Sequence, residues 1–172
     1  MSDPEIGAPE TLGTDHDLSP FGSGTPVLDD WLRRWALRNQ EAGASRTYVI
    51  CAGKRVVGYY ALAVGALAQA EATGRTPRNL PDPAPVMVLG RLAIDAAFQG
   101  RGLGRALLRD AVLRTVQAAD IAGIRAILVH AISEGARQFY QRCGFQPSPV
   151  DSMTLMITLR DAEQAVMKED DR

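Results

Sequence analysis

The chain has 172 residues, of which 46% are apolar and 23% are charged, and its formal net charge is −1. This composition predicts one globular domain, which at this length buries about 70% of the surface of the unfolded chain. Two cysteines are too few for a disulfide framework and favour a reducing compartment. The longest apolar run is shorter than the roughly 20 residues of a membrane span, and the acidic N-terminus does not resemble a signal peptide. We therefore expect a cytoplasmic protein that makes no contact with a membrane.

Charge is distributed unevenly along the chain. Residues 1–30 carry seven acids and no Lys or Arg, and residues 161–172 carry five acids and two bases. Residues 31–160 therefore keep 8 acids against 17 bases, and 16 of these bases are Arg. Because the guanidinium group binds phosphate bidentately, we expect an anionic partner, although a coding bias toward Arg would give the same surplus.

Residues 1–20 are acidic and rich in Gly and Pro, which predicts a flexible lead-in. Thr25 and Pro26 then offer an N-cap and a first helical position, and Gly43 offers an end. The spacing predicts an amphipathic helix over about 26–40. Its apolar face comprises Val27, Leu28, Trp31, Leu32 and Trp35, and its polar face carries Arg33, Arg34 and Arg38.

The rest of the chain alternates between strand-like and helix-like segments. Residues 47–52 and 55–64 predict a hairpin around Gly53, and 74–85 a proline-rich loop. After it we expect a strand over 86–94, a helix over 103–119, a strand over 124–130, a helix from Ser133 to Gly144, and a strand over 153–159. A strand, a helix and a strand in this order predict two parallel strands joined by a right-handed crossover.

The glycine-rich segment Gln99-Gly100-Arg101-Gly102-Leu103-Gly104-Arg105 lies between a predicted strand and a predicted helix. Glycines allow backbone N–H groups to turn toward an anion, and the helix N-terminus adds donors and a positive dipole end. No Gly-Lys-Ser/Thr follows, as the Walker pattern requires, and the glycine spacing does not fit the dinucleotide-binding fingerprint. The pattern that fits is Gln/Arg-x-x-Gly-x-Gly/Ala.

With this pattern the sequence resembles the GNAT superfamily of acetyl-CoA-dependent N-acetyltransferases. A second segment, Ala136-Arg137-Gln138-Phe139-Tyr140-Gln141-Arg142-Cys143-Gly144-Phe145, is similar to the Ala-x-x-Phe-Tyr-x-x-x-Gly-Phe segment of that superfamily. The resemblance implies an α/β GNAT fold, with a mixed central sheet splayed between two parallel strands and flanked by helices. The domain would span 21–160, between the lead-in at 1–20 and an acidic tail at 161–172.

The resemblance also implies the site. Tyr140 would face the thioester sulfur of acetyl-CoA and protonate the leaving thiolate, and backbone N–H groups of 92–94 would hold the acetyl carbonyl. The alternative for Tyr140 is a buried core ring. No metal and neither cysteine is needed, and His130 is interpreted as structural, with a substrate contact as the alternative. The implied cofactor-binding residues are Leu92, Ala93, Ile94, Gln99, Gly100, Arg101, Gly102, Leu103, Gly104, Arg105, Ser133 and Phe139.

Within the superfamily, five segments resemble the TacT-like acetyltransferase toxins of bacterial toxin–antitoxin modules. These are 28–32, 43–49, 58–62, 78–83 and 89–95. The resemblance implies acetylation of the α-amine of aminoacyl-tRNA, which blocks translation, together with a DNA-binding antitoxin and a homodimer as partners. Phosphates of the tRNA call for Arg near the thioester, and the candidates are Arg33, Arg34, Arg38, Arg46, Arg78 and Arg91.

Two other functions remain open from the sequence. The first is a GNAT enzyme that acetylates a small amine or a protein N-terminus. The second is a non-catalytic acyl-CoA-binding module that keeps the glycine-rich turn without the chemistry.

Overall fold

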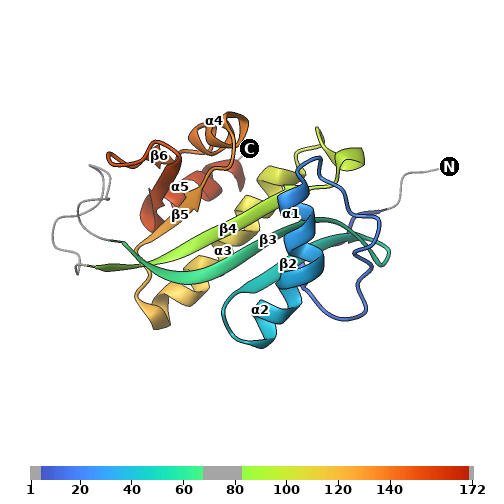
Figure 1. The fold of residues 1–172 in the computed structure, drawn as a ribbon. Helices are drawn as coiled ribbons and strands as arrows, with labels where there is room; N and C mark the ends of the chain where they lie inside the picture. The colour runs from blue at the N-terminus through green and yellow to red at the C-terminus, as the bar shows by residue number, and fades with distance from the viewer. Residues whose placement is uncertain (1–4, 68–82, 171–172) are drawn as a thin grey trace. The chain divides into compact units, whose positions relative to one another are not determined.

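The computed structural model describes residues 5–67 and 83–170. Its strands form a mixed seven-stranded sheet in the hydrogen-bonded order β1-β2-β3-β4-β5-β7-β6 (Figure 1). By their internal contacts the residues divide into a first unit, 1–63 with 90–110, and a second unit, 64–89 with 111–172. Most of the loop predicted at 74–85 lies outside the described residues. None of the described helices is both long and apolar enough to span a bilayer.

The first unit begins with three antiparallel strands, β1 (Glu10–Thr11), β2 (Arg46–Ala52) and β3 (Arg55–Leu67). The predicted hairpin is confirmed, and Gly53 adopts the left-handed φ of +65° that its turn requires. Unlike the flexible segment expected from the sequence, the lead-in pairs β1 with β2 and buries Leu12. The domain boundaries at residues 20 and 160 remain a prediction.

The predicted helix over 26–40 is confirmed as one continuous helical rod in three parts (Figure 1). These are α1 (Pro26–Trp31), the π-helical segment η1 (Leu32–Ala36) and α2 (Leu37–Glu41). The predicted cap at Thr25 makes no side-chain hydrogen bond. Instead the Ser23 hydroxyl donates to Asp29 Oδ1 at 2.6 Å, so Asp29 in the first turn anchors the loop before the helix.

One side of this rod packs into the core of the first unit. Leu32 and Ala36 are fully buried and pack in a cluster with Val49 and Tyr59. The prediction that Val27 and Trp35 share this buried face is wrong, because these residues are 62% and 50% exposed. With Leu32 and Ala36 filling the contact with the sheet, Trp35 lies on the flank of the rod.

The predicted crossover is confirmed, and its residues are divided between the two units. β4 (Ala84–Ile94), α3 (Leu103–Ala122) and β5 (Ala126–His130) follow in order, and β4 pairs parallel with β5. The ladder runs from Val86↔Ala126 to Leu89↔Val129, whereas β4 continues to Ile94. β5 ends at His130, one residue after the ladder, so the last part of β4 runs beyond its parallel partner.

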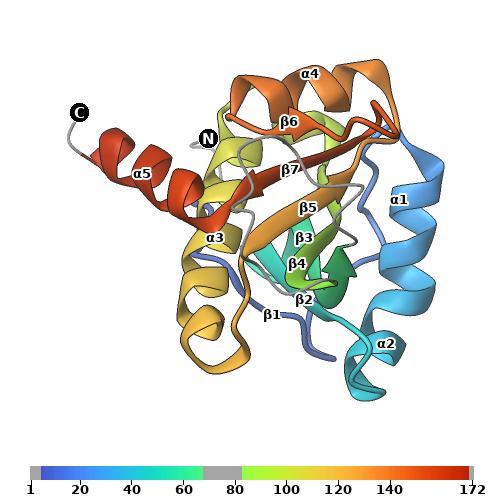
Figure 2. The ribbon, with the colours of Figure 1, turned by 90° about the vertical axis from the view of Figure 1, so that its left-hand side faces the viewer.

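The remaining elements of the second unit are α4 (Glu134–Arg142), β6 (Gln146–Pro147), β7 (Thr154–Thr158) and α5 (Leu159–Asp170). The predicted cap is confirmed, because Ser133 Oγ accepts from Ala136 N at 3.1 Å. Helix α4 ends before Gly144, whose φ is +99°. Figure 2 shows α4 beside β6 and β7, which it contacts.

Candidate active site

The glycine-rich turn joins the 3₁₀ segment η3 (Ala96–Phe98) to α3 in the first unit. Gly100 and Gly102 adopt φ values of +81° and +79°, a conformation that L side chains rarely take. A Cβ built on either glycine meets nothing within 4 Å. The backbone of the turn therefore faces open space on the side where a side chain would stand.

The Gln99 side chain has a structural part in this turn, and the binding of the cofactor by Gln99 stays a prediction. Its Nε2 donates to the carbonyl oxygens of Ser23 at 2.8 Å and Ile94 at 2.9 Å. The amide thus fastens the start of the turn to the end of β4 and to the loop before α1. Gln99 holds the turn in shape through its side chain.

The turn leads directly into α3, which starts at Leu103, and the Gly102 carbonyl accepts from Ala106 N at 3.1 Å. The first N–H groups of a helix have no partner inside the helix, and its dipole is positive there. Arg101 and Arg105 are exposed beside this end, with the Arg101 guanidinium 5.1 Å from the centre of the Phe98 ring. Backbone donors, a helix end and two cations suit the diphosphate of coenzyme A.

The strand before the turn ends on the segment expected to bind the acetyl carbonyl. Ala93 is buried, whereas Leu92 and Ile94 are half-buried. Asp95, 3% exposed, follows them and accepts from Gly22 N at 3.0 Å and from Ala97 N at 2.9 Å. These hydrogen bonds fix the end of β4, as a preorganised backbone site requires.

Tyr140 lies in the second unit on α4 and is 6% exposed. Its ring packs edge-on against Phe139, with centroids 5.3 Å apart, and against Phe145 at 5.5 Å. Burial, and to a smaller extent the Cys143 thiol, raises the pKa of the Tyr140 phenol. The phenol therefore keeps its proton throughout the physiological pH range.

Ser133, Phe139 and His130 also belong to the second unit. Ser133 caps α4, and the half-buried Phe139 supports Tyr140. His130 Nδ1 lies 3.0 Å from Thr154 Oγ1, which itself donates to Asp151 Oδ2 at 2.9 Å. This chain of polar contacts across β5 and β7 agrees with the structural interpretation of His130.

The arginines predicted to bind tRNA fall into different environments. Arg33 Nη1 donates to the Phe21 carbonyl at 2.6 Å and so anchors the loop before α1. Arg34, Arg38 and Arg46 are exposed. Arg78 lies outside the described residues. Arg91 is half-buried, a position that the sequence left undecided.

The Arg91 side chain extends from β4 over an aromatic stack. Its guanidinium lies 4.4 Å from the centre of the Trp31 ring, and Trp31 stacks on Tyr59 with centroids 6.1 Å apart. The Tyr59 hydroxyl donates to the Leu28 carbonyl at 2.7 Å. This stack was not predicted from the sequence. Alternation along β4 places Arg91 on the same face as Ala93, which packs in the cluster beneath α1.

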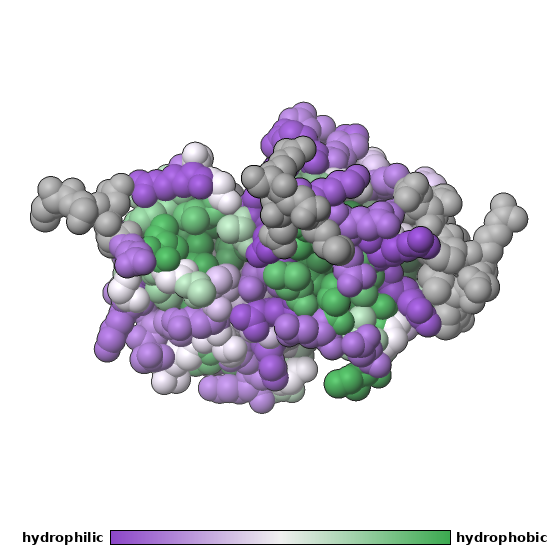
Figure 3. Space-filling view, turned by 180° about the vertical axis from the view of Figure 1, so that it is seen from behind, coloured by the Kyte–Doolittle hydropathy of each residue, from purple (hydrophilic) through white to green (hydrophobic). Residues whose placement is uncertain are grey.

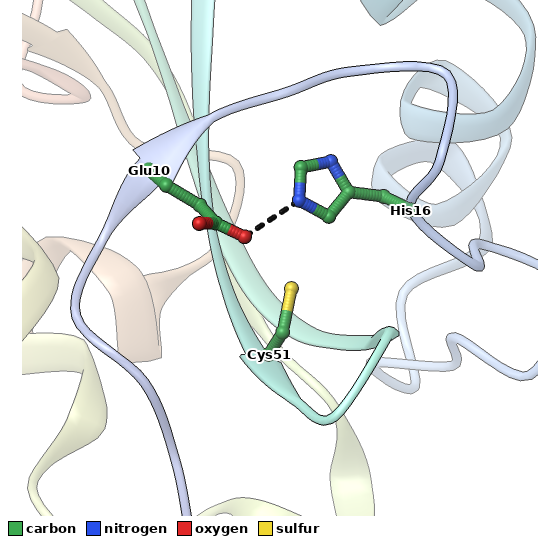
Figure 4. Close-up of side chains that lie close together, drawn as sticks. All are labelled: Glu10, His16 and Cys51. Atoms are coloured by element: carbon green, nitrogen blue, oxygen red, sulfur yellow. Dashed lines mark hydrogen bonds and ion pairs between the residues drawn. The ribbon is translucent and has the colours of Figure 1, made fainter.

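One further cluster of chemically active groups consists of Glu10, His16 and Cys51 (Figure 4). Gly13 N donates to His16 Nδ1 at 2.9 Å, so Nε2 carries the ring proton and donates to Glu10 at 2.7 Å. A metal on Nε2 would require a proton on Nδ1, opposite the Gly13 N–H. Burial raises the pKa of the Cys51 thiol to about 11. This cluster holds the lead-in against β2 and suits neither a metal ion nor a nucleophilic thiolate.

The acetyltransferase (GNAT) domain family matches residues 43–147, which include β2, the glycine-rich turn and Tyr140. A tRNA-acetylating toxin of Mycobacterium tuberculosis (strain ATCC 25618 / H37Rv) is 52% identical over 159 residues, covering 92% of this chain and 96% of the relative.

Two solved structures are similar to the fold as a whole. AtaT complexed with acetyl-methionyl-tRNAfMet has a TM-score of 0.86 at 28% identity, over 93% of this chain and 98% of that one. A Tyr-to-Phe mutant of AtaT bound to the C-terminus of the antitoxin AtaR and acetyl-CoA has a TM-score of 0.79 at 28% identity, over 95% and 98%. This chain therefore belongs to the GNAT acetyltransferase family, and among its relatives are tRNA-acetylating toxins.

Proposed function

We propose that this protein transfers the acetyl group of acetyl-CoA to the α-amine of aminoacyl-tRNA and so acts as a toxin that blocks translation. The observation that carries the proposal is the 52% identity to a tRNA-acetylating toxin over nearly the whole chain. The open turn at Gly100 and Gly102, ahead of α3, supports a donor that carries a diphosphate.

Donor binding would be divided between backbone and side chains. The N–H groups around Gly100–Gly104 would hold the diphosphate, and Arg101 and Arg105 would add positive charge. Acetyl-CoA supplies the activated thioester when it is bound. Backbone N–H groups of Leu92–Ile94 would stabilise the negative charge that develops on the acetyl oxygen, which is worth about 3–4 kcal/mol per donor.

Tyr140 would act as the general acid for the leaving thiolate. Burial keeps the phenol protonated and so available as a donor. The same burial makes it a weaker acid, so the proton transfer requires direct contact with the leaving thiolate. The attacking amine has to be neutral, and an α-amino group with a pKa of about 8 is partly neutral at physiological pH. Water would therefore suffice to accept its proton, and the reaction needs no covalent intermediate on the protein.

The acceptor is proposed from the charge distribution as well as from the relatives. The excess of Arg over acids in residues 31–160 suits phosphate groups of a tRNA. Of the candidates, Arg34, Arg38 and Arg46 are exposed, and Arg91 extends from the strand that would bind the acetyl group.

The proposed protein partners are a DNA-binding antitoxin and a second copy of the chain, in the cytoplasm. Hydrophobic side chains emerge in patches on the face of the molecule seen in Figure 3. Leu113 and Ile121 on α3 are exposed by 38% and 93%. Exposed apolar patches are typical of surfaces that bind other proteins.

Labelled acetyl-CoA tests the acceptor directly. The purified protein is incubated with bulk aminoacyl-tRNA, deacylated tRNA, polyamines and peptides, and the label is followed. We expect acetyl transfer to aminoacyl-tRNA alone. Transfer to peptides or polyamines but not to aminoacyl-tRNA would favour the general acetyltransferase, and donor binding without transfer would favour the non-catalytic module.

A further inference from the structure

The flank of the α1–α2 rod carries alternating aromatic and cationic side chains. Trp31, Arg34, Trp35 and Arg38 follow one another along the part of the rod that includes the π-helical segment η1, and Arg38 contacts the Trp35 ring. Arg91 joins them from β4. We call these five residues the Trp–Arg stripe.

In the Trp–Arg stripe, each indole ring lies beside the guanidinium group of an Arg side chain. The Arg91 guanidinium lies 4.4 Å from the centre of the Trp31 ring, and the Arg38 guanidinium lies 5.8 Å from the centre of the Trp35 ring. Trp35 is 50% exposed, and Arg34 and Arg38 are exposed beside it. A large indole therefore stands in solvent between two positive charges.

This composition favours single-stranded nucleic acid over other anions. Unstacked bases lie on indole rings and guanidinium planes, while Arg side chains bind the phosphates between them. The Trp31 ring already contacts Tyr59 and the Arg91 guanidinium, whereas the Trp35 ring is half exposed. Trp35 is therefore the indole of the stripe that is accessible to an unstacked base.

The position of Arg91 indicates which part of a tRNA would lie there. Arg91 directly precedes Leu92, where the backbone proposed to bind the acetyl carbonyl begins. In an aminoacyl-tRNA, the amino acid that carries the reactive amine is esterified through its carboxyl group to the last nucleotide of the single-stranded 3′ end. The nucleotides next to that amine must therefore lie close to Arg91.

We infer that the Trp–Arg stripe binds the single-stranded 3′ end of the tRNA acceptor, with Trp35 as a platform for one unstacked base. The inference rests on the proposed function and adds to it the surface that positions the acceptor. Trp35 is a positioning residue, because it acts on the nucleotides and not on the reacting atoms.

A double-mutant cycle between protein and RNA tests the inference. The affinity of deacylated tRNA, with its 3′ end intact or shortened by the single-stranded nucleotides, is measured for the wild type and for Trp35→Ala. Both changes should weaken binding at least fivefold, and the two together should weaken it no more than either alone. Fully additive losses would overturn the inference, because Trp35 would then contact another part of the tRNA.

Kinetics provide the second measurement. Trp35→Ala should raise KM for aminoacyl-tRNA at least fivefold and leave kcat within twofold, and Trp35→Phe should restore most of the affinity by keeping a ring. Val150→Ala, which shortens another exposed apolar side chain to which no binding role is assigned, is the control and should change neither constant. An unchanged KM in Trp35→Ala, combined with weaker binding of an acidic antitoxin peptide, would assign the stripe to a protein partner and overturn the inference.

The salt dependence of tRNA affinity tests whether the Arg side chains of the stripe contact phosphates. Arg38→Ala should lower the slope of log affinity against log salt by about 0.7 to 1, whereas Arg125→Ala, also exposed, should leave it unchanged. A wild type that binds and acetylates no aminoacyl-tRNA would instead contradict the proposed function, and with it this inference. An active wild type that is insensitive to every change in the stripe would contradict the inference alone.

Discussion

Tyr140 is the residue on which the proposed chemistry depends most. In Tyr140→Phe the ring still packs between Phe139 and Phe145, and only the hydroxyl is lost. Because general acid catalysis contributes about 10²- to 10⁴-fold, we expect kcat to fall at least 100-fold while the Kd for acetyl-CoA stays within twofold. Steady-state kinetics and calorimetry measure the two quantities, and an unchanged kcat would remove Tyr140 from the mechanism.

The raised pKa of the Tyr140 phenol also predicts the pH profile. A group whose pKa is raised stays protonated, and so remains a competent acid, above the ordinary phenol value of about 10. We therefore expect kcat/KM to rise with pH as the acceptor amine loses its proton, and then to stay level up to pH 9.5. A decrease between pH 8 and 9.5 that Tyr140→Phe abolishes would show that the phenol ionises in its ordinary range.

The reactivity of the Cys51 thiol tests whether the lead-in stays packed on β2. Its thiol is buried, and its pKa of about 11 keeps it protonated at pH 8, whereas alkylating reagents need the thiolate. In the folded protein we expect a thiol reagent to modify the half-buried Cys143 well before Cys51. Mass spectrometry after timed labelling gives the order. Equal rates at the two positions would indicate that the lead-in does not stay packed on β2.

At the scale of elements, the role of the glycine-rich turn can be tested against a matched control position at the other end of α3. Gly102 and Gly123 flank the two ends of α3, and both adopt a left-handed φ with open space at the Cβ position. A side chain at either position therefore costs about the same backbone strain, roughly 1 kcal/mol. Only the position before the N-terminus of α3 faces the proposed diphosphate.

Gly102→Asp should therefore weaken acetyl-CoA binding at least 100-fold through charge repulsion at the helix end. Gly123→Asp should lose at least as much thermal stability, because a carboxylate is unfavourable at the negative end of the helix dipole, but it should keep the affinity of the wild type. Calorimetry with acetyl-CoA and thermal denaturation of both variants provide the comparison. Equal affinities in the two variants would contradict the assignment of the turn to the donor.

Most of these elements were predictable because local signals mark them. Gly53 and Gly144 stand where left-handed turns are needed, Ser133 caps α4 through its own hydroxyl, and the strand–helix–strand order predicted the parallel pair of β4 and β5. The two-residue strands β1 and β6 were not predictable, because their pairing depends on partners distant in sequence.

The side chains around the candidate site were harder to predict than the elements. Gln99 fits the acetyltransferase pattern, but only the fold shows that its amide binds the carbonyls of Ser23 and Ile94. Trp35 has the spacing of a core residue and yet is half exposed, because Leu32 and Ala36 already fill the contact with the sheet. Periodicity finds a helix face, whereas neighbours in three dimensions decide which residues that face buries.

At the scale of the whole molecule, we expect the toxicity of the protein to depend on its acetyltransferase activity. Expression of the wild type in bacterial cells should stop protein synthesis within minutes, measured by incorporation of a labelled amino acid. Tyr140→Phe, expressed to the same level, should leave synthesis unaffected because it binds acetyl-CoA without turnover. Arrest by both forms would mean that binding alone, and not acetylation, is toxic.

The most direct test of the central claim is a single-turnover reaction between the protein loaded with labelled acetyl-CoA and purified aminoacyl-tRNA. After mild hydrolysis of the ester, we expect the label on the α-amine of the released amino acid, and none with Tyr140→Phe. Label that stays on coenzyme A, or that appears on the RNA itself, would contradict the account.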